Sequence, residues 1–317
     1  MNRHQQVLTG VLIVQVVLSV LLWWPRGTGG EPAAQVFPDI TVDDVEEFSI
    51  TDDAGSTVSI RRVGDAWALP DAGDFPVLAD RAASFLEKLL GLTTARMVTR
   101  TSASHPQLGV AYNEFVRRIE FSTSAGAQHT VYLGSSPSYG ATHFRVDGQD
   151  ETYLTSDLTT WEVNGTAASW VDTTYLSLPA EDVARISLEN SQGSFQLVKD
   201  DDGSWTLSGL TGGEELNSNE VNAVVNATLS VFLQEPLGRA EKPEYGMSEP
   251  AAVVTLEVNG QPVSLYVGAK SDADAGYVVK SSQSEYYVEV ASYAVEPLVD
   301  SARDSFVLPP ATPTPDA

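Results

Sequence analysis

An internal repeat is the feature of this sequence that most constrains its fold. The segment VDDVEEFSI at 42–50 resembles AEDVARISL at 180–188, and at the same spacing Trp67 is matched by Trp205. Further segments pair in the same order, with small shifts in spacing: LADRAASFLEKLLGL (78–92) with NSNEVNAVVNATLSV (217–231), HPQLGV (105–110) with KPEYGM (242–247), VYLGS (131–135) with LYVGA (265–269), and ETYL (151–154) with EYYV (285–288). A preserved order of similar segments predicts two tandem copies of one unit. We place the copies at 36–175 and 176–308.

Each copy has the periodicity of an α+β unit. The segments STVSIRRVGDAWAL and SFQLVKDDDGSWTL read as strand, turn and strand, because Gly and Asp favour turns. Residues 78–92 and 217–231 follow, with apolar side chains at helical spacing. Asn217 and Glu220 are typical of a capping box at the start of the second helix. Alternating strands complete the unit, so we expect an antiparallel β-sheet with one main amphipathic helix on one face.

Residues that the copies share are interpreted as architecture. Trp67 and Trp205 each follow a hairpin turn, whereas the acids of DDDG before Trp205 have no counterpart before Trp67. We therefore interpret those acids as solvating a turn. Shared glycines mark two further corners of the unit: Gly109 with Gly246, and Gly134 with Gly268.

The N-terminus predicts a membrane anchor within residues 1–30. The run VLTGVLIVQVVLSVLLWW at 7–24 carries no charge, and as a helix it would be about 27 Å long, close to the thickness of a bilayer core. Arg3 and the amino terminus precede the run, which favours an orientation with the bulk of the chain outside the cytoplasm. The apolar run is longer than that of a removable signal peptide, so we expect an uncleaved single-pass anchor. At the other end, residues 309–317 are rich in Pro and Thr and are expected to be disordered.

Charge and cysteine content argue against several classes of function. The chain has 43 acidic residues against 18 Lys and Arg, a net charge of -25, which disfavours binding to nucleic acid. The absence of cysteine excludes disulfides, thiolate metal sites and cysteine nucleophiles. The sequence contains no phosphate-binding or dinucleotide-binding motif, and GSSPSYG at 134–140 lacks the spacing of a serine nucleophile elbow. We expect no cofactor, no metal and no enzymatic activity.

Two groups of residues are candidates for a site that binds a ligand or a partner. Trp161 and Trp170 have no aromatic counterparts in the second copy, and together with Tyr175 they lie where the copies join. They are either interface core or an exposed platform for a glycan, a peptide or a partner protein. Asp272 and Asp274 alternate before a glycine as early calcium ligands do, but no acid closes the loop. They form either a weak cation site or a solvated loop.

The order of these motifs resembles the DUF4340 family of bacterial proteins. The resemblance rests on the N-terminal apolar segment, on VFPDITVDDVEEFSI, and on the hairpins, helix, turns and strands quoted above, over residues 36–308. It implies a membrane-tethered extracytoplasmic protein and brings no catalytic residues, and some relatives look like auxiliary parts of ABC-type transport systems linked to gliding motility. We expect a membrane-anchored scaffold or accessory protein with an envelope-protein partner. The alternative is a glycan- or peptide-binding module at the junction between the copies.

Overall fold

The computed structural model describes residue 15 and residues 33–200, 202–271 and 276–308. Most of the predicted anchor, Asp272 and Asp274, and the tail at 309–317 lie outside the described residues. Within the described ranges, no helix has the length and apolar character needed to cross a membrane.

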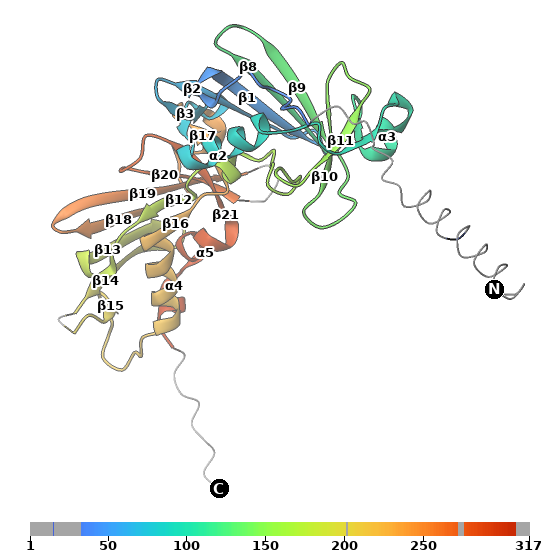
Figure 1. The fold of residues 1–317 in the computed structure, drawn as a ribbon. Coiled ribbons are helices and arrows are strands. Elements are labelled where there is room, and N and C mark those ends of the chain that lie inside the picture. The colour runs from blue at the N-terminus through green and yellow to red at the C-terminus, as the bar shows by residue number, and fades with distance from the viewer. Residues whose placement is uncertain (1–14, 16–32, 201, 272–275, 309–317) are drawn as a thin grey trace, which may run out of the picture.

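Two large antiparallel sheets and a few helices make up the described chain, which confirms the α+β class (Figure 1). The first sheet has the order β4 (Phe75–Pro76), β3 (Ala66–Leu69), β2 (Thr57–Val63), β1 (Val45–Asp52), β8 (Arg117–Thr123), β9 (Gln128–Leu133), β10 (Thr142–Val146), β11 (Thr152–Thr155), β5 (Met97–Thr99). The second has the order β15 (Trp205–Leu207), β14 (Gly193–Lys199), β13 (Val183–Asn190), β18 (Ala252–Val258), β19 (Gln261–Lys270), β20 (Gly276–Ser281), β21 (Tyr287–Ala291), β17 (Glu235–Gly238).

Strands in corresponding positions of the sequence occupy corresponding positions in the two sheets. Apart from the added β4, the order β3-β2-β1-β8-β9-β10-β11-β5 is reproduced as β15-β14-β13-β18-β19-β20-β21-β17. The central pairs also share a register irregularity near their start, at Val45 in β1 and at Val183 in β13. In each large sheet, the first strand of that sheet after the main helix, β5 or β17, lies at the far edge. We call residues 36–175 and 176–308 the first and second halves.

One main helix packs on each sheet, and both predicted helices are confirmed. Helix α2 (Ala79–Leu90) buries an apolar stripe that includes Phe85, Leu86 and Leu89, and α4 (Ser218–Leu229) buries its Val and Leu side chains. The predicted capping box of α4 is wrong. The Asn217 side chain instead donates to the Ser305 carbonyl oxygen at 2.8 Å, and Glu220 accepts from the Ser301 hydroxyl at 2.6 Å. Both cap residues therefore bind the segment after α5 (Ser292–Asp300).

The paired glycines lie at equivalent corners of the two halves. Gly109 follows the short helix α3 (His105–Leu108) with φ 67°, and Gly246 follows a 3₁₀ turn (Pro243–Tyr245) with φ 66°, so both use the left-handed backbone that glycine favours. A Cβ atom on Gly134 would overlap the Leu108 carbonyl oxygen. A Cβ atom on Gly268 would likewise overlap the Tyr245 carbonyl oxygen. Each corner thus brings a glycine, Gly134 directly after β9 or Gly268 within β19, against the backbone of the preceding turn.

The halves differ in the segment that follows their last long strand. In the second half, β21 runs directly into α5, which packs beside α4 and buries Val295 and Leu298 (Figure 1). In the first half, β11 is followed by an irregular segment that ends in a 3₁₀ turn, η4 (Ala167–Trp170). The sequence pattern did not reveal α5, because Pro297 lies inside it and Pro disfavours helix interiors.

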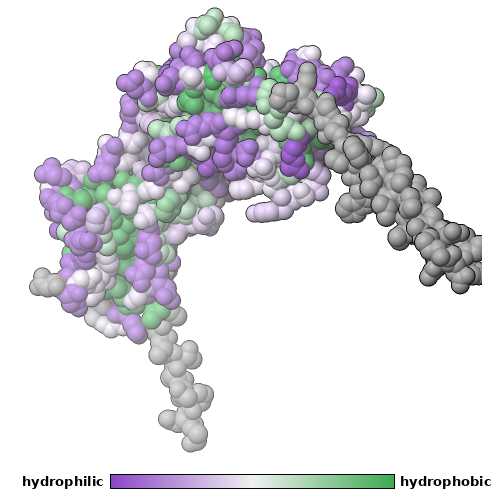
Figure 2. Space-filling view, in the orientation of Figure 1, coloured by the Kyte–Doolittle hydropathy of each residue, from purple (hydrophilic) through white to green (hydrophobic). Residues whose placement is uncertain are grey.

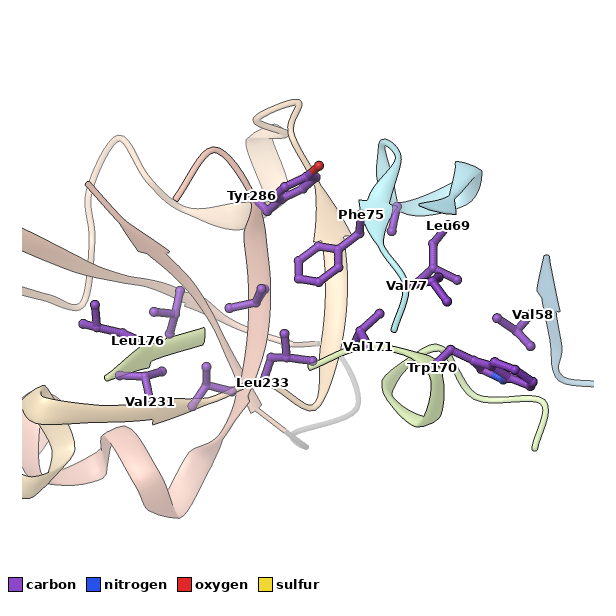
Figure 3. Close-up of a cluster of buried hydrophobic side chains, with 14 of the residues drawn as sticks. Val58, Leu69, Phe75, Val77, Trp170, Val171, Leu176, Val231, Leu233 and Tyr286 are labelled. Carbon is purple, nitrogen blue, oxygen red and sulfur yellow. The ribbon is translucent and has the colours of Figure 1, made fainter. Parts of the chain in front are cut away.

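A continuous hydrophobic core joins the halves. Buried side chains run from Leu176, Val231 and Leu233 of the second half, past Val171 and the Phe75–Tyr286 contact, to Trp170 of the first (Figure 3). Two short strands, β12 (Thr174–Ser177) and β16 (Ser230–Phe232), pair at this junction. The boundary drawn between residues 175 and 176 therefore falls within β12.

Polar contacts reinforce the junction. The Tyr286 hydroxyl donates to the Asp74 carbonyl oxygen at 2.9 Å and accepts from Arg239 Nη2 at 2.6 Å. Its ring lies 4.6 Å from the ring of Phe75. Gly73 and Gly238 bring their backbones together, since a Cβ atom on Gly73 would be 3.0 Å from the backbone nitrogen of Arg239. Side-chain and backbone contacts together hold the halves in one arrangement.

Candidate ligand pocket

A pocket of about 250 Å³ lies beside α2 in the first half. Its walls come from the exposed side of that helix and from the segment between β11 and β12. The lining residues are Arg81, Ser84, Phe85, Lys88, Leu158, Trp161, Glu162 and Trp170. Two of the three aromatic residues predicted as a binding platform, Trp161 and Trp170, therefore meet in one pocket.

Trp161 and Trp170 have different environments within this pocket. Trp170 is 1% exposed, packs edge-on against Phe48 and Phe85, and donates from Nε1 to the Asn164 carbonyl oxygen at 2.9 Å. It is a core residue that forms the floor. Trp161 is 70% exposed, so its ring remains available for contact with a ligand.

Tyr175 lies apart from the pocket, at the junction of the halves. Its hydroxyl donates to the Tyr286 carbonyl oxygen at 2.7 Å and accepts from the Ser281 amide at 2.9 Å. Burial raises the pKa of Tyr175. These contacts tie the end of the first half to the sheet of the second half, so Tyr175 takes the role of interface core.

Two cations and one carboxylate give the pocket its charge. Lys88 Nζ lies 2.7 Å from Glu162 Oε1, and the Arg81 guanidinium lies over the Trp170 ring at 5.4 Å. Within the described part of the chain, Arg81 forms no ion pair with an acid. Desolvation acts to raise the pKa of Glu162, but hydrogen bonds from Lys88 and Thr159 outweigh it and lower that pKa. Glu162 therefore stays ionised at neutral pH, and the pocket keeps one unneutralised cation.

Sequence reasoning identified the two tryptophans but missed Arg81, Ser84 and Lys88. The three residues occupy positions i, i+3 and i+7 of α2, which places them on one face of the helix. The sequence did contain a signal for these residues: Arg81 and Lys88 lie on one face of a helix in a chain that has only 18 Lys and Arg against 43 acids. The location also corrects the expected platform, which lies within the first half and not between the halves.

The predicted repeat tryptophans have related surroundings. Trp67 pairs across the hairpin with Arg62, whose guanidinium lies 4.5 Å from the ring centroid. Trp205 pairs with Lys199, whose amine lies 5.8 Å from the ring centroid. The residues differ in depth: Trp67 is buried, and Trp205 is half-buried at the edge of the core.

Ser135 and His143 form a hydrogen-bonded pair that does not have the geometry of a nucleophile and its base. His143 Nδ1 lies 2.8 Å from the Ser135 carbonyl oxygen, which can act only as an acceptor, and 3.1 Å from the hydroxyl of the same serine. Nδ1 therefore carries the proton and cannot take one from the hydroxyl. Among the described residues, no group of three or more His, Asp or Glu side chains is arranged to hold a metal ion.

The described surface has other hollows, which the sequence did not predict. One of about 420 Å³ is lined by residues 36–40 and by His129, where the chain enters the first sheet. His129 stacks on Phe121, and its Nε2 is buried without a hydrogen-bond partner. In the view of Figure 2, hydrophilic residues cover most of the surface and hydrophobic residues show in smaller areas on both halves.

Comparison with known proteins identifies the family. The family model of DUF4340, described as a domain of unknown function, matches residues 67–250, from the Trp67 hairpin to the end of the Gly246 turn. No curated protein and no solved structure matches the chain. Since the family model covers more than half of the sequence, the chain belongs to the DUF4340 family.

Proposed function

We propose that this protein is a membrane-anchored extracytoplasmic scaffold, in which two copies of one α+β unit hold a partner protein. The anchor at residues 7–24 would tether it, and an envelope or membrane protein, such as a component of an ABC-type transport system, would be its partner. The observation that supports a scaffold most strongly is the junction. A scaffold must keep its surfaces at a fixed spacing, and a continuous core with the Tyr286 and Gly73–Gly238 contacts provides that rigidity.

Affinity purification of the full chain from membranes in mild detergent tests the scaffold. We expect a defined partner to be recovered in comparable amount, and recovery of the bare chain would contradict the proposal. A Tyr286→Ala variant loosens the junction and should recover less partner. Tyr293→Ala is the matched control, because Tyr293 is 79% exposed and takes part in none of the junction contacts described above.

A second function, binding of a small ligand by the first half, is favoured by the pocket beside α2. The exposed ring of Trp161 and the guanidinium of Arg81, which has no acidic partner among the described residues, line one hollow, as polar and aromatic groups do in ligand sites. Retention of a ligand that is lost in Trp161→Ala, with an unchanged melting temperature, would support this function. A loss of folding in that variant would instead show Trp161 to be structural.

A further inference from the structure

We propose that the pocket beside α2 binds an acidic sugar, with the sugar ring against Trp161 and its carboxylate at Arg81. This inference rests on the second proposed function and names the class of ligand. It starts from a difference between the halves. The pocket lies where the segment after β11 stays irregular, whereas the corresponding segment of the second half folds into α5 and packs beside α4.

The segment after β11 fills the core and leaves part of the helix face uncovered. Leu158 and Trp170 are each 1% exposed and complete the packing on α2. Trp161 lies three residues beyond Leu158 and stays 70% exposed. An exposed tryptophan next to a buried one offers a flat apolar surface on a rigid base, which suits the apolar face of a sugar ring.

The charge of the pocket selects an anion. Glu162 is held by Lys88 and Thr159. Of the two cations that line the pocket, Arg81 is therefore the one without an acidic partner among the described residues. Its guanidinium can bind a carboxylate through two parallel hydrogen bonds. The chain as a whole is strongly acidic, with a net charge of -25, so a local cationic site concentrates anions where the surrounding surface repels them.

The form of the pocket favours a sugar over a peptide. A volume of about 250 Å³ accommodates a single sugar ring with its substituents. Peptides that bind in extended form usually add a strand to an open sheet edge. This pocket is bounded by a helix and an irregular segment, and none of the described residues that line it belongs to a strand.

Ligand-observed NMR of the full chain with D-glucuronate tests the proposal, with D-glucose as the neutral counterpart. We expect saturation transfer to glucuronate and little transfer to glucose. Arg81→Gln should weaken glucuronate binding by about 10- to 100-fold, because it removes a charge-assisted hydrogen bond. Trp161→Ala should weaken it similarly. Arg96→Gln is the matched control, since Arg96 is also exposed and lies outside the pocket, and it should bind as the wild type does.

Three results would overturn the proposal. Equal binding of glucose and glucuronate would remove the role of Arg81, and binding unchanged in both pocket variants would place the ligand elsewhere. Binding of an acidic peptide such as trialanyl-glutamate, but of no sugar, would show the ligand class to be wrong while the pocket remained a binding site. The scaffold function is judged separately, by partner recovery with Trp161→Ala. Full recovery would leave the scaffold standing even where sugar binding fails.

Discussion

Removal of one hydroxyl at the junction should measurably destabilise the protein. In Tyr286→Phe the ring contact with Phe75 is kept, while the hydrogen bonds to the Asp74 carbonyl oxygen and from Arg239 are lost. Tyr286 is 8% exposed, so the Asp74 carbonyl loses its partner in a region with little water. Arg239 is partly exposed and can be rehydrated, which limits its share of the loss. A net loss of about 1–2 kcal/mol follows from the usual value of such bonds.

Urea unfolding followed by tryptophan fluorescence measures this loss. For an m-value of about 3 kcal/mol/M, the midpoint should fall by about 0.5 M. Tyr287→Phe is the matched control: its hydroxyl donates to Glu241 at 3.0 Å within the second half, and that exposed carboxylate can turn to water. We expect a smaller shift for Tyr287→Phe. An unchanged midpoint in Tyr286→Phe, or a larger shift in the control, would refute the role assigned to the junction.

Four further predictions follow from individual contacts. Trp170→Ala should cost about 3–5 kcal/mol of unfolding free energy by calorimetry, whereas Trp161→Ala should change it by less than about 0.5 kcal/mol. Equal effects would contradict the assignment of Trp170 as a core residue and of Trp161 as an exposed one. Gly134→Ala and Gly268→Ala should each cost at least about 2 kcal/mol because a Cβ atom would overlap a backbone oxygen, and Gly212→Ala, with open space around it, serves as the control. The pKa of Glu162 is lowered in the folded state, so ionised Glu162 stabilises the protein above the ordinary glutamate pKa of 4.5. This stabilisation is lost as the pH falls through the lowered pKa. A carboxyl NMR titration that gives Glu162 a pKa at or above 4.5 would contradict the assigned contacts with Lys88 and Thr159. Burial, together with the charge of Glu235 on the neighbouring strand, raises the pKa of Glu289. Glu289→Gln should therefore stabilise the protein by up to about 1 kcal/mol at pH 7. Destabilisation of the protein by this substitution at pH 7 would contradict the repulsion between Glu235 and Glu289.

Local periodicity was sufficient to predict the sheets and the main helices. The stripe at 78–92 gave α2 (Ala79–Leu90), and the one at 217–231 gave α4 (Ser218–Leu229), each within two residues at either end. These patterns are readable because each element buries a single face. The same reasoning found the glycine corners, since a positive φ or a close backbone contact leaves a glycine in both copies.

Contacts between distant segments could not be read from the sequence. Asn217 occupies the N-cap position of α4, but its side-chain amide binds Ser305 across 88 residues, and the sequence contains no sign of that partner. Predicting the pocket beside α2 would have required both the exposed face of the helix and the path of the chain after β11, which contains a 3₁₀ turn but no α-helix. Trp161 and Trp170 were recognised as unusual, but their different burial depends on that path.

A distance measurement between the halves tests the central claim most directly. The chain has no cysteine, so Gln128→Cys and Gln192→Cys place one spin label on an exposed site of each half without interference. If the junction holds the halves as one body, double electron–electron resonance will give a single narrow distance distribution. A broad or multi-peaked distribution would mean that the halves move independently, and the scaffold account would then be wrong.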